Sequence, residues 1–551
     1  MPTRREPTGR PTARAALILV CATILSGVTP PSGAVGAGAA TDPPPQVAAR
    51  TVAETRAAGP ARATPPAATP RPPAARPGRP PAPTGCVNTP RGWQAAERAT
   101  TAGRTALPIA NHTRFAGPAT AYVDEPVARC GRPIDIHIGS TRSRQVRVEI
   151  LRVGDYRGAP ARVVWRSGTI RVPARALTPP KGEWTASTTW PATLRVTPSN
   201  RWRPGLHLIR TTPLDDPRHP SWQPVWLAVS GPRPPLVVVA SDLTALAYNR
   251  YGGRSLYFGP GRDRTEQSTT RAYHAWARRP VSEQGLTHVL SMEVPLARLL
   301  DRLGVSADWT TDSELDADPA LLRRYTGVVL PGHSEYWTSA MYDGVEKAVA
   351  GGVNVANLGA NSFYWQARTT RDARGRLTAM TLYRENDLDP VTDRRLTTVR
   401  WATPLLDRDP ARLLGVRTTA IGFRSSPVVV DPPSWFVAGT RLRPGAVLVS
   451  GAGNEGDGVI ARVSPANTQV LLASTSAKGA RVTTTYRSTP SGAALFSAGT
   501  TYWTCLAVDA CGSQSAPPAT RTALTALTRN VLTAAATPRF GRAHPSSGPT
   551  P

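Results

Sequence analysis

The sequence predicts an all-β region followed by a doubly wound α/β domain. Between residues 116 and 232, short runs alternate apolar and polar residues, and clusters of Gly, Pro and Asn separate them. Such runs are typical of strands that bury one face of an antiparallel sandwich. Between residues 233 and 538, continuous apolar runs alternate with amphipathic stretches of helix length, which is typical of parallel strands covered on both faces. A chain of 551 residues is long enough for two such cores.

The all-β region contains seven short runs that we expect to be strands. One of them has a distinctive start, because Trp202-Arg203-Pro204-Gly205 leads directly into Leu206–Ile209. A turn followed by a strand in this form is common in immunoglobulin-like modules, so we expect an immunoglobulin-like sandwich. The runs span residues 120–128, 134–140, 145–154, 161–167, 193–199, 205–212 and 222–230.

The α/β region begins with the continuous apolar run Leu236–Ser241, which we expect to be a buried parallel strand. Further strands are expected at residues 307–311, 325–332, 353–361 and 496–500. Three amphipathic stretches alternate with them and predict helices at residues 294–305, 340–352 and 521–535. In a sheet of this kind, ligands bind beyond the carboxyl ends of the strands.

The first 40 residues have the features of a signal peptide. Four arginines between Arg4 and Arg14 precede an apolar run from Ala15 to Val28, and small residues follow it. The run is shorter than the roughly 20 residues that a membrane span needs. We therefore expect a secreted protein, with a retained N-terminal membrane anchor as the alternative.

Two segments are predicted to be disordered. Residues 41–115 are rich in Pro, Ala and Arg, and residues 539–551 are similarly poor in large apolar side chains. Such segments bury too little apolar surface to offset the entropy that ordering costs. We expect a linker before the folded part and a short tail after it.

The formal net charge of +29 does not indicate nucleic-acid binding. Lysine occurs only at Lys181, Lys347 and Lys478, and the arginines are scattered over the predicted linker, strands and helices. The basic residues form no cluster with interleaved aromatic side chains, which is the usual signature of a nucleic-acid surface. Peripheral association with an anionic envelope surface stays open.

Four cysteines remain after loss of Cys21 with the signal peptide. An even number in an exported chain indicates two disulfides. Proximity in sequence favours Cys86–Cys130 and Cys505–Cys511 among the three possible pairings. None of the cysteine or histidine spacings is typical of a zinc site.

Polar side chains follow two of the predicted strands. The loop Pro331–Trp337 comes after one strand, and the loop Gly359–Trp365 comes after the next. If these strands are neighbours in the sheet, His333, Glu335 and Asn361 converge on one crevice. An imidazole, a carboxylate and an amide around one ligand are a plausible catalytic set.

A purely structural interpretation competes with this one. Ser334 or Thr338 can cap the following helix, with Glu335 as a first-turn acid whose ionised form the helix dipole favours. No G-x-S-x-G sequence surrounds Ser334, so we expect no serine nucleophile there. The segment Asn454–Gly458 resembles a calcium loop only in composition, and we interpret it as a hairpin turn.

Three segments follow one another along the α/β region, namely ALAYNRYGGRSLYFG (Ala245–Gly259), GHSEYWT and GANSFYW. In this order they resemble the C-terminal domain of the N,N-dimethylformamidase large (beta) subunit. The resemblance extends over about Pro234 to Ala536 and implies a doubly wound domain that is glutamine-amidotransferase-like or flavodoxin-like.

The resemblance also implies a mononuclear iron, held by tyrosine phenolates and a glutamate, and hydrolysis of a small amide. By position, Glu335 and Tyr248 would be metal ligands. His333 would transfer protons and Asn361 would hold the substrate carbonyl. For the second phenolate the sequence offers Tyr257 or Tyr273.

Other positions match the family less well. Arg384 stands for the basic residue expected after the second loop and, with Tyr336 and Trp365, is predicted to bind substrate. An acid expected late in the domain has no clear match, since that stretch offers Arg487.

Two functions follow from these observations. The first is an exported hydrolase that acts on a C–N amide bond of a small molecule or of a cell-envelope component. The alternative is a non-catalytic envelope or carbohydrate-binding protein that uses the same crevice as a pocket. The sequence gives no indication of oligomeric state or of a small partner subunit.

Overall fold

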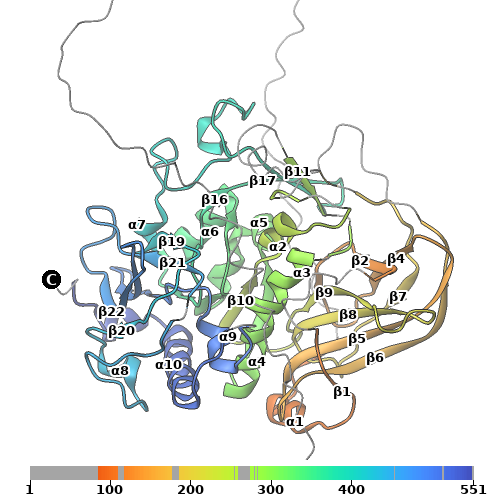
Figure 1. Ribbon diagram of the computed structural model, residues 1–551, viewed down its shortest axis with the longest axis horizontal. Coiled ribbons are helices and arrows are strands. Elements are labelled where there is room, and N and C mark those ends of the chain that lie inside the picture. The colour runs from red at the N-terminus through yellow and green to blue at the C-terminus, as the bar shows by residue number, and fades with distance from the viewer. Residues whose placement is uncertain are drawn as a thin grey trace, which may run out of the picture.

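The structure is a computed structural model. It describes residues 85–108, 117–175, 185, 187–252, 255–257, 273–277, 279–281, 283–451, 453–511 and 514–548. The predicted signal peptide and the greater part of the predicted linker lie outside these residues. The described chain is a mixed α/β structure, with the β-rich N-terminal region at one end of the molecule and the helices and strands of the C-terminal region at the other (Figure 1).

The N-terminal region contains a six-stranded sheet in the order β1-β6-β5-β8-β9-β3 and a three-stranded sheet in the order β2-β4-β7. Side chains from both sheets, among them Ile136, Ile150 and Val225, form one apolar core. The short helix α1 (Trp93–Ala99) precedes the strands. The strands are β1 (Arg104–Thr105), β2 (Ala119–Val123), β3 (Val127–Ala128), β4 (Ile134–Ser140), β5 (Arg144–Tyr156), β6 (Ala159–Val172), β7 (Leu194–Val196), β8 (Gly205–Pro213) and β9 (Ser221–Leu227).

An eight-stranded sheet forms the centre of the C-terminal region, in the order β12-β10-β13-β15-β24-β23-β22-β20. Its first five strands are parallel and its last three are antiparallel. All five residues of Leu236–Ala240 are completely buried, as expected for a central strand with both faces covered. The strands are β10 (Leu236–Ala240), β12 (Ala307–Thr311), β13 (Gly327–Leu330), β15 (Asn354–Asn357), β20 (Val428–Val429), β22 (Gln469–Thr475), β23 (Arg481–Ser488) and β24 (Ala494–Ser497).

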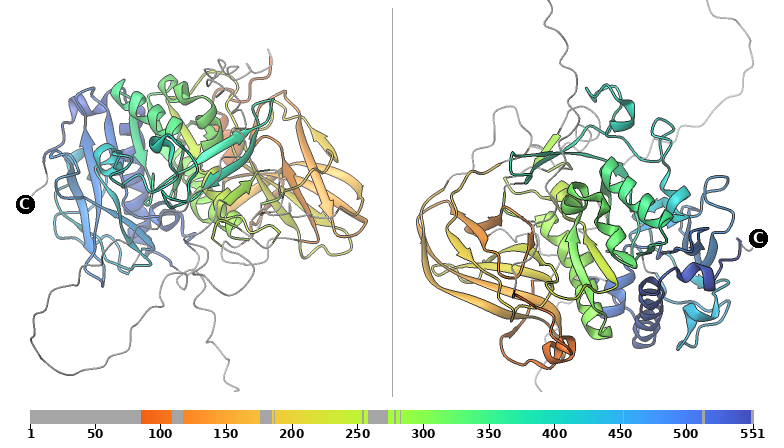
Figure 2. Two further views of the ribbon diagram at one scale, coloured as in Figure 1. Left: turned by 90° about the horizontal axis from the view of Figure 1, so that it is seen from above. Right: turned by 180° about the vertical axis from the view of Figure 1, so that it is seen from behind.

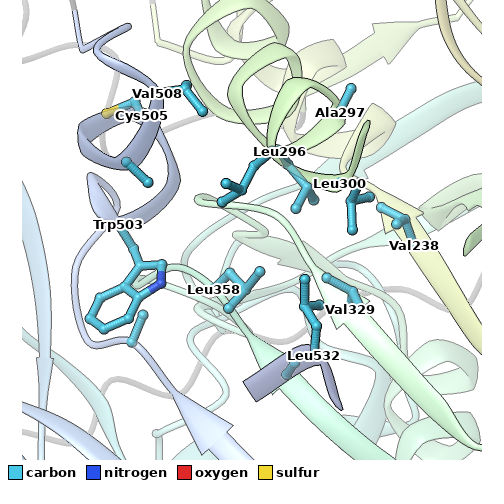
Figure 3. Close-up of a cluster of buried hydrophobic side chains, with 14 of the residues drawn as sticks. Val238, Leu296, Ala297, Leu300, Val329, Leu358, Trp503, Cys505, Val508 and Leu532 are labelled. Carbon is cyan, nitrogen blue, oxygen red and sulfur yellow. The ribbon is translucent and has the colours of Figure 1, made fainter. Parts of the chain in front are cut away.

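Helices cover both faces of the parallel strands (Figure 2). On one face, Val238 and Val329 pack against Leu296, Leu300 and other side chains of α4 and α10 (Figure 3). On the other face, side chains of α2, α5 and α6 fill the second core. These helices are α2 (Asp242–Tyr248), α3 (Glu283–His288), α4 (Val294–Leu303), α5 (Asp312–Ala317), α6 (Ser339–Ala350), α9 (Trp503–Val508) and α10 (Pro518–Ala536).

Shorter elements surround this framework. The pair β14 with β16 and the pair β19 with β21 each form a two-stranded sheet, and β11, β18 and β17 form a three-stranded one. A single turn of π-helix joins α3 to α4. The elements are β11 (Tyr273–Trp276), the π-turn (Val289–Glu293), a 3-10 turn (Pro319–Arg324), β14 (Tyr336–Trp337), β16 (Trp365–Gln366), β17 (Arg368–Arg371), β18 (Leu377–Leu382), a 3-10 turn (Arg394–Leu396), α7 (Pro410–Leu414), β19 (Arg417–Ile421), α8 (Ser434–Val437), β21 (Glu455–Gly458) and α11 (Phe540–Ala543).

The two regions share one apolar core rather than touching through a polar linker. Leu151 and Leu208 of the six-stranded sheet belong to the same cluster as Leu296 and Leu300 of α4. Buried polar contacts also cross this junction. The Arg152 guanidinium donates to both carboxylate oxygens of Asp301, at 2.7 and 2.9 Å. The pair joins β5 of the N-terminal region to α4 of the C-terminal region through a buried contact.

Both favoured disulfides form. Cys86 is joined to Cys130 and Cys505 to Cys511. The first ties the segment before α1 to the end of β3, and the second closes the turn after α9. The disulfides are compatible with an extracellular protein. Among the described residues, none of the helices combines the length and the hydrophobicity of a membrane span.

Two predictions of disorder need correction where the structure describes the residues. Residues 85–108 of the predicted linker contain α1, in which Trp93 and Glu97 are buried. Residues 539–548 of the predicted tail are also structured, because Phe540 is buried in the core and Ser546 exchanges hydrogen bonds with Ser488. In both segments a single aromatic side chain supplies the apolar anchor that average composition conceals.

Three carboxyl groups lie close together where β10 and β12 end. Glu293 and Asp312 are completely buried, and Asp242 beside them is half-buried. Glu293 accepts hydrogen bonds from Trp226 Nε1 at 2.8 Å and from the Ser241 amide at 3.0 Å. Burial raises the pKa of Glu293 to about 8 and that of Asp242 to about 6. Glu293 therefore carries its proton at neutral pH, unlike an exposed glutamate.

Replacing Glu293 by Gln should change how stability depends on pH. Between the ordinary glutamate pKa of about 4.3 and the folded-state value of about 8, the folded protein holds a proton that the unfolded chain has lost. The wild-type contribution of this group therefore falls as pH rises through that window. We expect the stability of Glu293→Gln relative to wild type to rise by on the order of 3–4 kcal/mol between pH 5 and pH 8.5. Urea unfolding of both proteins at pH 5 and pH 8.5 measures the difference in their free energies of unfolding. A difference that is the same at both pH values would contradict the prediction.

Candidate active site

Two loops meet at the carboxyl end of the parallel sheet. β13 and β15 pair as neighbours, so Pro331–Trp337 and Gly359–Trp365 leave the same edge. The loops pass so closely that a Cβ atom on Gly359 would lie 2.3 Å from the Gly332 carbonyl oxygen. Only glycine permits this approach.

The three predicted catalytic residues are brought together by these loops. His333, Glu335 and Asn361 are 5%, 3% and 2% exposed. The neighbouring Glu455 side chain keeps 15% of its surface exposed. Asn361 and Phe363 hold left-handed backbone conformations, with φ of 55° and 58°. Such strain at non-glycine residues concentrates at functional sites.

Two tyrosines hold the Glu335 carboxylate. The Tyr248 hydroxyl donates to Oε2 at 2.9 Å and the Tyr257 hydroxyl donates to Oε1 at 2.8 Å. Tyr248 ends α2, and its ring stacks on that of Tyr257 with centroids 4.3 Å apart. The Glu335 amide is fixed in turn by Thr244 Oγ1 at 3.0 Å. Of the two candidates for a second phenol, the structure places Tyr257 at Glu335, whereas the Tyr273 side chain lies outside the described part.

The three residues predicted to bind substrate lie beside these tyrosines. Tyr336 is completely buried, and its hydroxyl donates to the Tyr257 hydroxyl. The Arg384 guanidinium lies over the Tyr257 ring at 4.8 Å and over the Trp365 ring at 5.6 Å. Arg384 is another residue with a left-handed backbone, with φ of 66°.

His333 faces two carboxylates. Its Nε2 lies 3.0 Å from Glu455 Oε2 and 3.5 Å from Glu335 Oε2. Asn361 Nδ2 donates to the same Glu455 oxygen at 3.0 Å, and Asn361 Oδ1 accepts from the Thr418 hydroxyl at 2.9 Å. These partners fix which end of the Asn361 amide faces His333.

Glu455 was missed by the sequence interpretation. We expected Asn454–Gly458 to be a hairpin turn, but Glu455–Gly458 is strand β21, paired with β19. Because side chains alternate along a strand, Glu455 and Asp457 point to the same side, toward the site. The Asp457 carboxylate accepts a hydrogen bond from the backbone N–H of Asn361 at 2.8 Å. The alternation of acidic residues and glycines in Glu455–Gly458 was the pattern in the sequence that could have predicted this strand.

His288 is a second residue that sequence reasoning did not find. It ends α3 next to the π-turn, its ring lies 5.2 Å from that of His333, and it hydrogen-bonds the His333 backbone. Its Nε2 has no hydrogen-bond partner in the described part of the chain. π-turns of this kind are frequent at functional sites.

A family model described as N,N-dimethylformamidase beta subunit-like, C-terminal, matches residues 147–513. The chain belongs to this family. The match covers well over half of the sequence and starts inside β5, so it includes part of the N-terminal β region as well as the whole site. No curated protein sequence matches the chain.

Glu455 and the Tyr248–Tyr257 pair lie beside Glu335 and His333, whereas the late acid and the second tyrosine that the resemblance implies stay predictions. Among the described residues, no group of three or more His, Cys, Asp and Glu side chains has the arrangement of a metal site. The oxygen cluster of this dimethylformamidase-like chain differs from such groups in its residue types, because it combines one carboxylate, Glu335, with the phenols of Tyr248 and Tyr257.

The structural interpretation of Glu335 was half right. Thr338 caps α6, accepting a hydrogen bond from the Met341 amide at 3.2 Å. Glu335 precedes β14 and is outside the first turn of that helix. Burial raises the pKa of Glu335, against the opposing influence of His333 and of the two phenols. The helix dipole is therefore not what sets its charge.

The charges around His333 form a linked set. Burial opposes a charged ring, but the carboxylates of Glu455 and Glu335 outweigh it and raise the pKa of His333 to about 9. Burial likewise opposes ionisation of Glu455, yet His333 and Asn361 lower its pKa. Burial also raises the pKa of Tyr248 and Tyr257 well above the usual range. At neutral pH His333 is a cation paired with Glu455, so its Nε2 donates a proton and its 3.3 Å approach to Asn361 Nδ2 is only a contact.

Replacing Glu455 by Gln should lower the pKa of His333. Glu455 is the largest influence that raises this pKa, so we expect the value in metal-free protein to fall from about 9 toward the ordinary value of about 6.5. Titration of the histidine ring signals by NMR measures it, with His333→Gln to assign the signal. Asp457→Asn is the matched control, because Asp457 contributes least among the carboxylates. Equal shifts in the two variants would contradict the assigned pairing.

Proposed function

We propose that this protein is an exported hydrolase that acts on a C–N amide bond. The observation that supports it is the single cluster in which Tyr248, Tyr257 and Glu335 supply oxygens next to His333 and Asn361. Family membership suggests a dimethylformamidase-like hydrolase. The substrate we propose is a small-molecule amide or an amide of the cell envelope.

The donor set fits a ferric ion. One carboxylate and two phenols are hard oxygen ligands, which suit a hard cation better than the thiolate and imidazole sets of zinc sites do. Tyr248, Tyr257 and Glu335 would hold the ion, and the phenolic hydrogens that now lie on Glu335 would be lost on binding. The ion would supply Lewis acidity toward an amide carbonyl or a water molecule.

The remaining residues have separate tasks. Asn361 Nδ2 is oriented by Thr418 and can donate to the carbonyl oxygen of the amide. His333, kept protonated beside Glu455, can give a proton to the departing nitrogen. Tyr336, Arg384 and Trp365 would line the substrate. Three contacts support these tasks: the hydrogen bond from Thr418 to Asn361, the pair of His333 with Glu455, and the stacking of Arg384 on Tyr257.

Location and architecture belong to the same proposal. The N-terminal sequence and two disulfides support export. We infer an immunoglobulin-like N-terminal sandwich and a doubly wound, flavodoxin-like or glutamine-amidotransferase-like arrangement of the parallel strands, supported by the strand order and by helices on both faces. Peripheral contact with the envelope is consistent with the surplus of arginine.

Loss of the proposed ligands should abolish metal retention without unfolding the protein. We expect Glu335→Gln and Tyr257→Phe to lower ferric affinity by more than the roughly 10–100-fold that loss of an outer partner costs. The readouts are metal analysis of protein purified without chelators and the visible absorption that iron-bound phenolates give.

The matched control is Tyr251→Phe, which removes a hydroxyl that bonds Thr120 outside the cluster. It should retain iron and colour. Turnover of small amides and of cell-wall amides is then screened with the metal-loaded wild type. Full iron occupancy in Glu335→Gln would remove Glu335 from the ligand set, and absence of turnover across both amide classes would refute the hydrolase.

A further inference from the structure

A row of alternating aromatic rings and guanidinium groups runs from the site to the surface. Arg384 lies over Tyr257 at 4.8 Å and over Trp365 at 5.6 Å. Arg400 then lies over Trp365 at 5.4 Å and over Tyr364 at 5.2 Å. The rings are half-buried and Arg400 is exposed, so the row leads from a proposed ligand to solvent.

The row is attached rigidly to the site. The amides of Tyr364 and Trp365 both donate to the Glu335 carbonyl oxygen, each at 3.0 Å. The strand segment that carries Arg400 is fixed on both sides of that residue, because Gln366 N donates to Val399 O at 2.9 Å and Trp401 N donates to Tyr364 O at 3.0 Å. The backbone at Arg400 therefore keeps a defined position relative to Glu335.

The two guanidiniums differ in what balances their charge. Arg384 hydrogen-bonds Tyr336 and interacts with the Glu335 carboxylate. Arg400 has no carboxylate within ion-pair distance among the described residues. By contrast, several other arginines stacked on aromatic rings also pair with acids, for example Arg368 with Asp389 and Arg408 with Asp343 and Glu346.

We propose that Arg400 binds a carboxylate on the substrate, so that the natural substrate is an amide bearing an acid group at its other end. This rests on the proposed function for the identity of the reacting amide. A planar guanidinium matches a carboxylate with two parallel hydrogen bonds, and stacking on Tyr364 and Trp365 orders it beforehand. The substrate must also be long enough to reach from Glu335 past Trp365, which a formamide is not.

The test uses matched pairs of ligands. Monoamides of glutaric, adipic and pimelic acid carry a carboxylate where the corresponding diamides carry a carboxamide of the same shape. Binding of each to the purified full chain is measured by titration calorimetry, in metal-free and metal-loaded protein. We expect at least one monoamide to bind about tenfold more tightly than its diamide, the size of one charge-assisted hydrogen-bonded pair. The preference should weaken as salt is raised.

Arg400→Gln should abolish this preference, and Arg400→Lys should restore only part of it because an ammonium lacks the planar fork. The matched control is Arg233→Gln. Arg233 is also exposed and stacks on Tyr325 at 5.5 Å, but it precedes β10 and so lies at the opposite edge of the sheet. This control should keep the full preference.

Three results decide between the proposals. Equal binding of monoamides and diamides, or an unchanged preference in Arg400→Gln, would overturn the role of Arg400. Turnover of neutral amides alone, unaffected by Arg400→Gln, would overturn the acidic substrate while sparing the hydrolase. A carboxylate preference that depends on Arg400 without any turnover would support this inference and refute amide hydrolysis.

Discussion

The site depends on one buried carboxylate and on what surrounds it. Desolvation of Glu335 is unfavourable for its charged form, and the protein offsets this with two phenolic hydrogen bonds and a nearby cationic histidine. Removing any of these partners would make the ionised form of Glu335 less favourable and so raise its pKa further. The hydrogen bonds from Tyr248 and Tyr257 therefore lower the cost of keeping a charged Glu335 inside the protein.

That constraint explains why the surrounding backbone is strained. Glu335 lies in the loop that follows β13, and the loop from β15 must approach within contact distance for Asn361 to reach His333. Gly332 and Gly359 make this approach possible, while Asn361 and Arg384 adopt left-handed conformations that cost free energy. The two large apolar cores on either side of the sheet hold the edge in place and so offset that cost.

The features that sequence could predict are local ones. The apolar run Leu236–Ala240 and the amphipathic segment of α6 carry their own periodicity, and the two loops could be placed at one sheet edge because parallel strands end together. Glu455 could not be found in this way. It lies nearly one hundred residues beyond Asn361, and only the pairing of β21 with β19 brings it back. The prediction of disorder was wrong for residues 85–108 and 539–548 for a related reason. Tertiary contacts of Trp93 and Phe540 order segments whose composition alone predicts disorder.

The role of the β-rich region also emerges only from long-range packing. Trp226 of β9 donates to Glu293, which in turn accepts from the Ser241 amide at the start of α2, the helix that ends at Tyr248. A strand of the N-terminal region is therefore linked, through Glu293, to the start of the helix that supplies a phenol to Glu335. The Arg152–Asp301 pair ties the same two regions at α4, which continues from the π-turn next to His288. Because the family match begins in β5 rather than at β10, this β region is better regarded as part of the platform that positions the site than as a separate attachment.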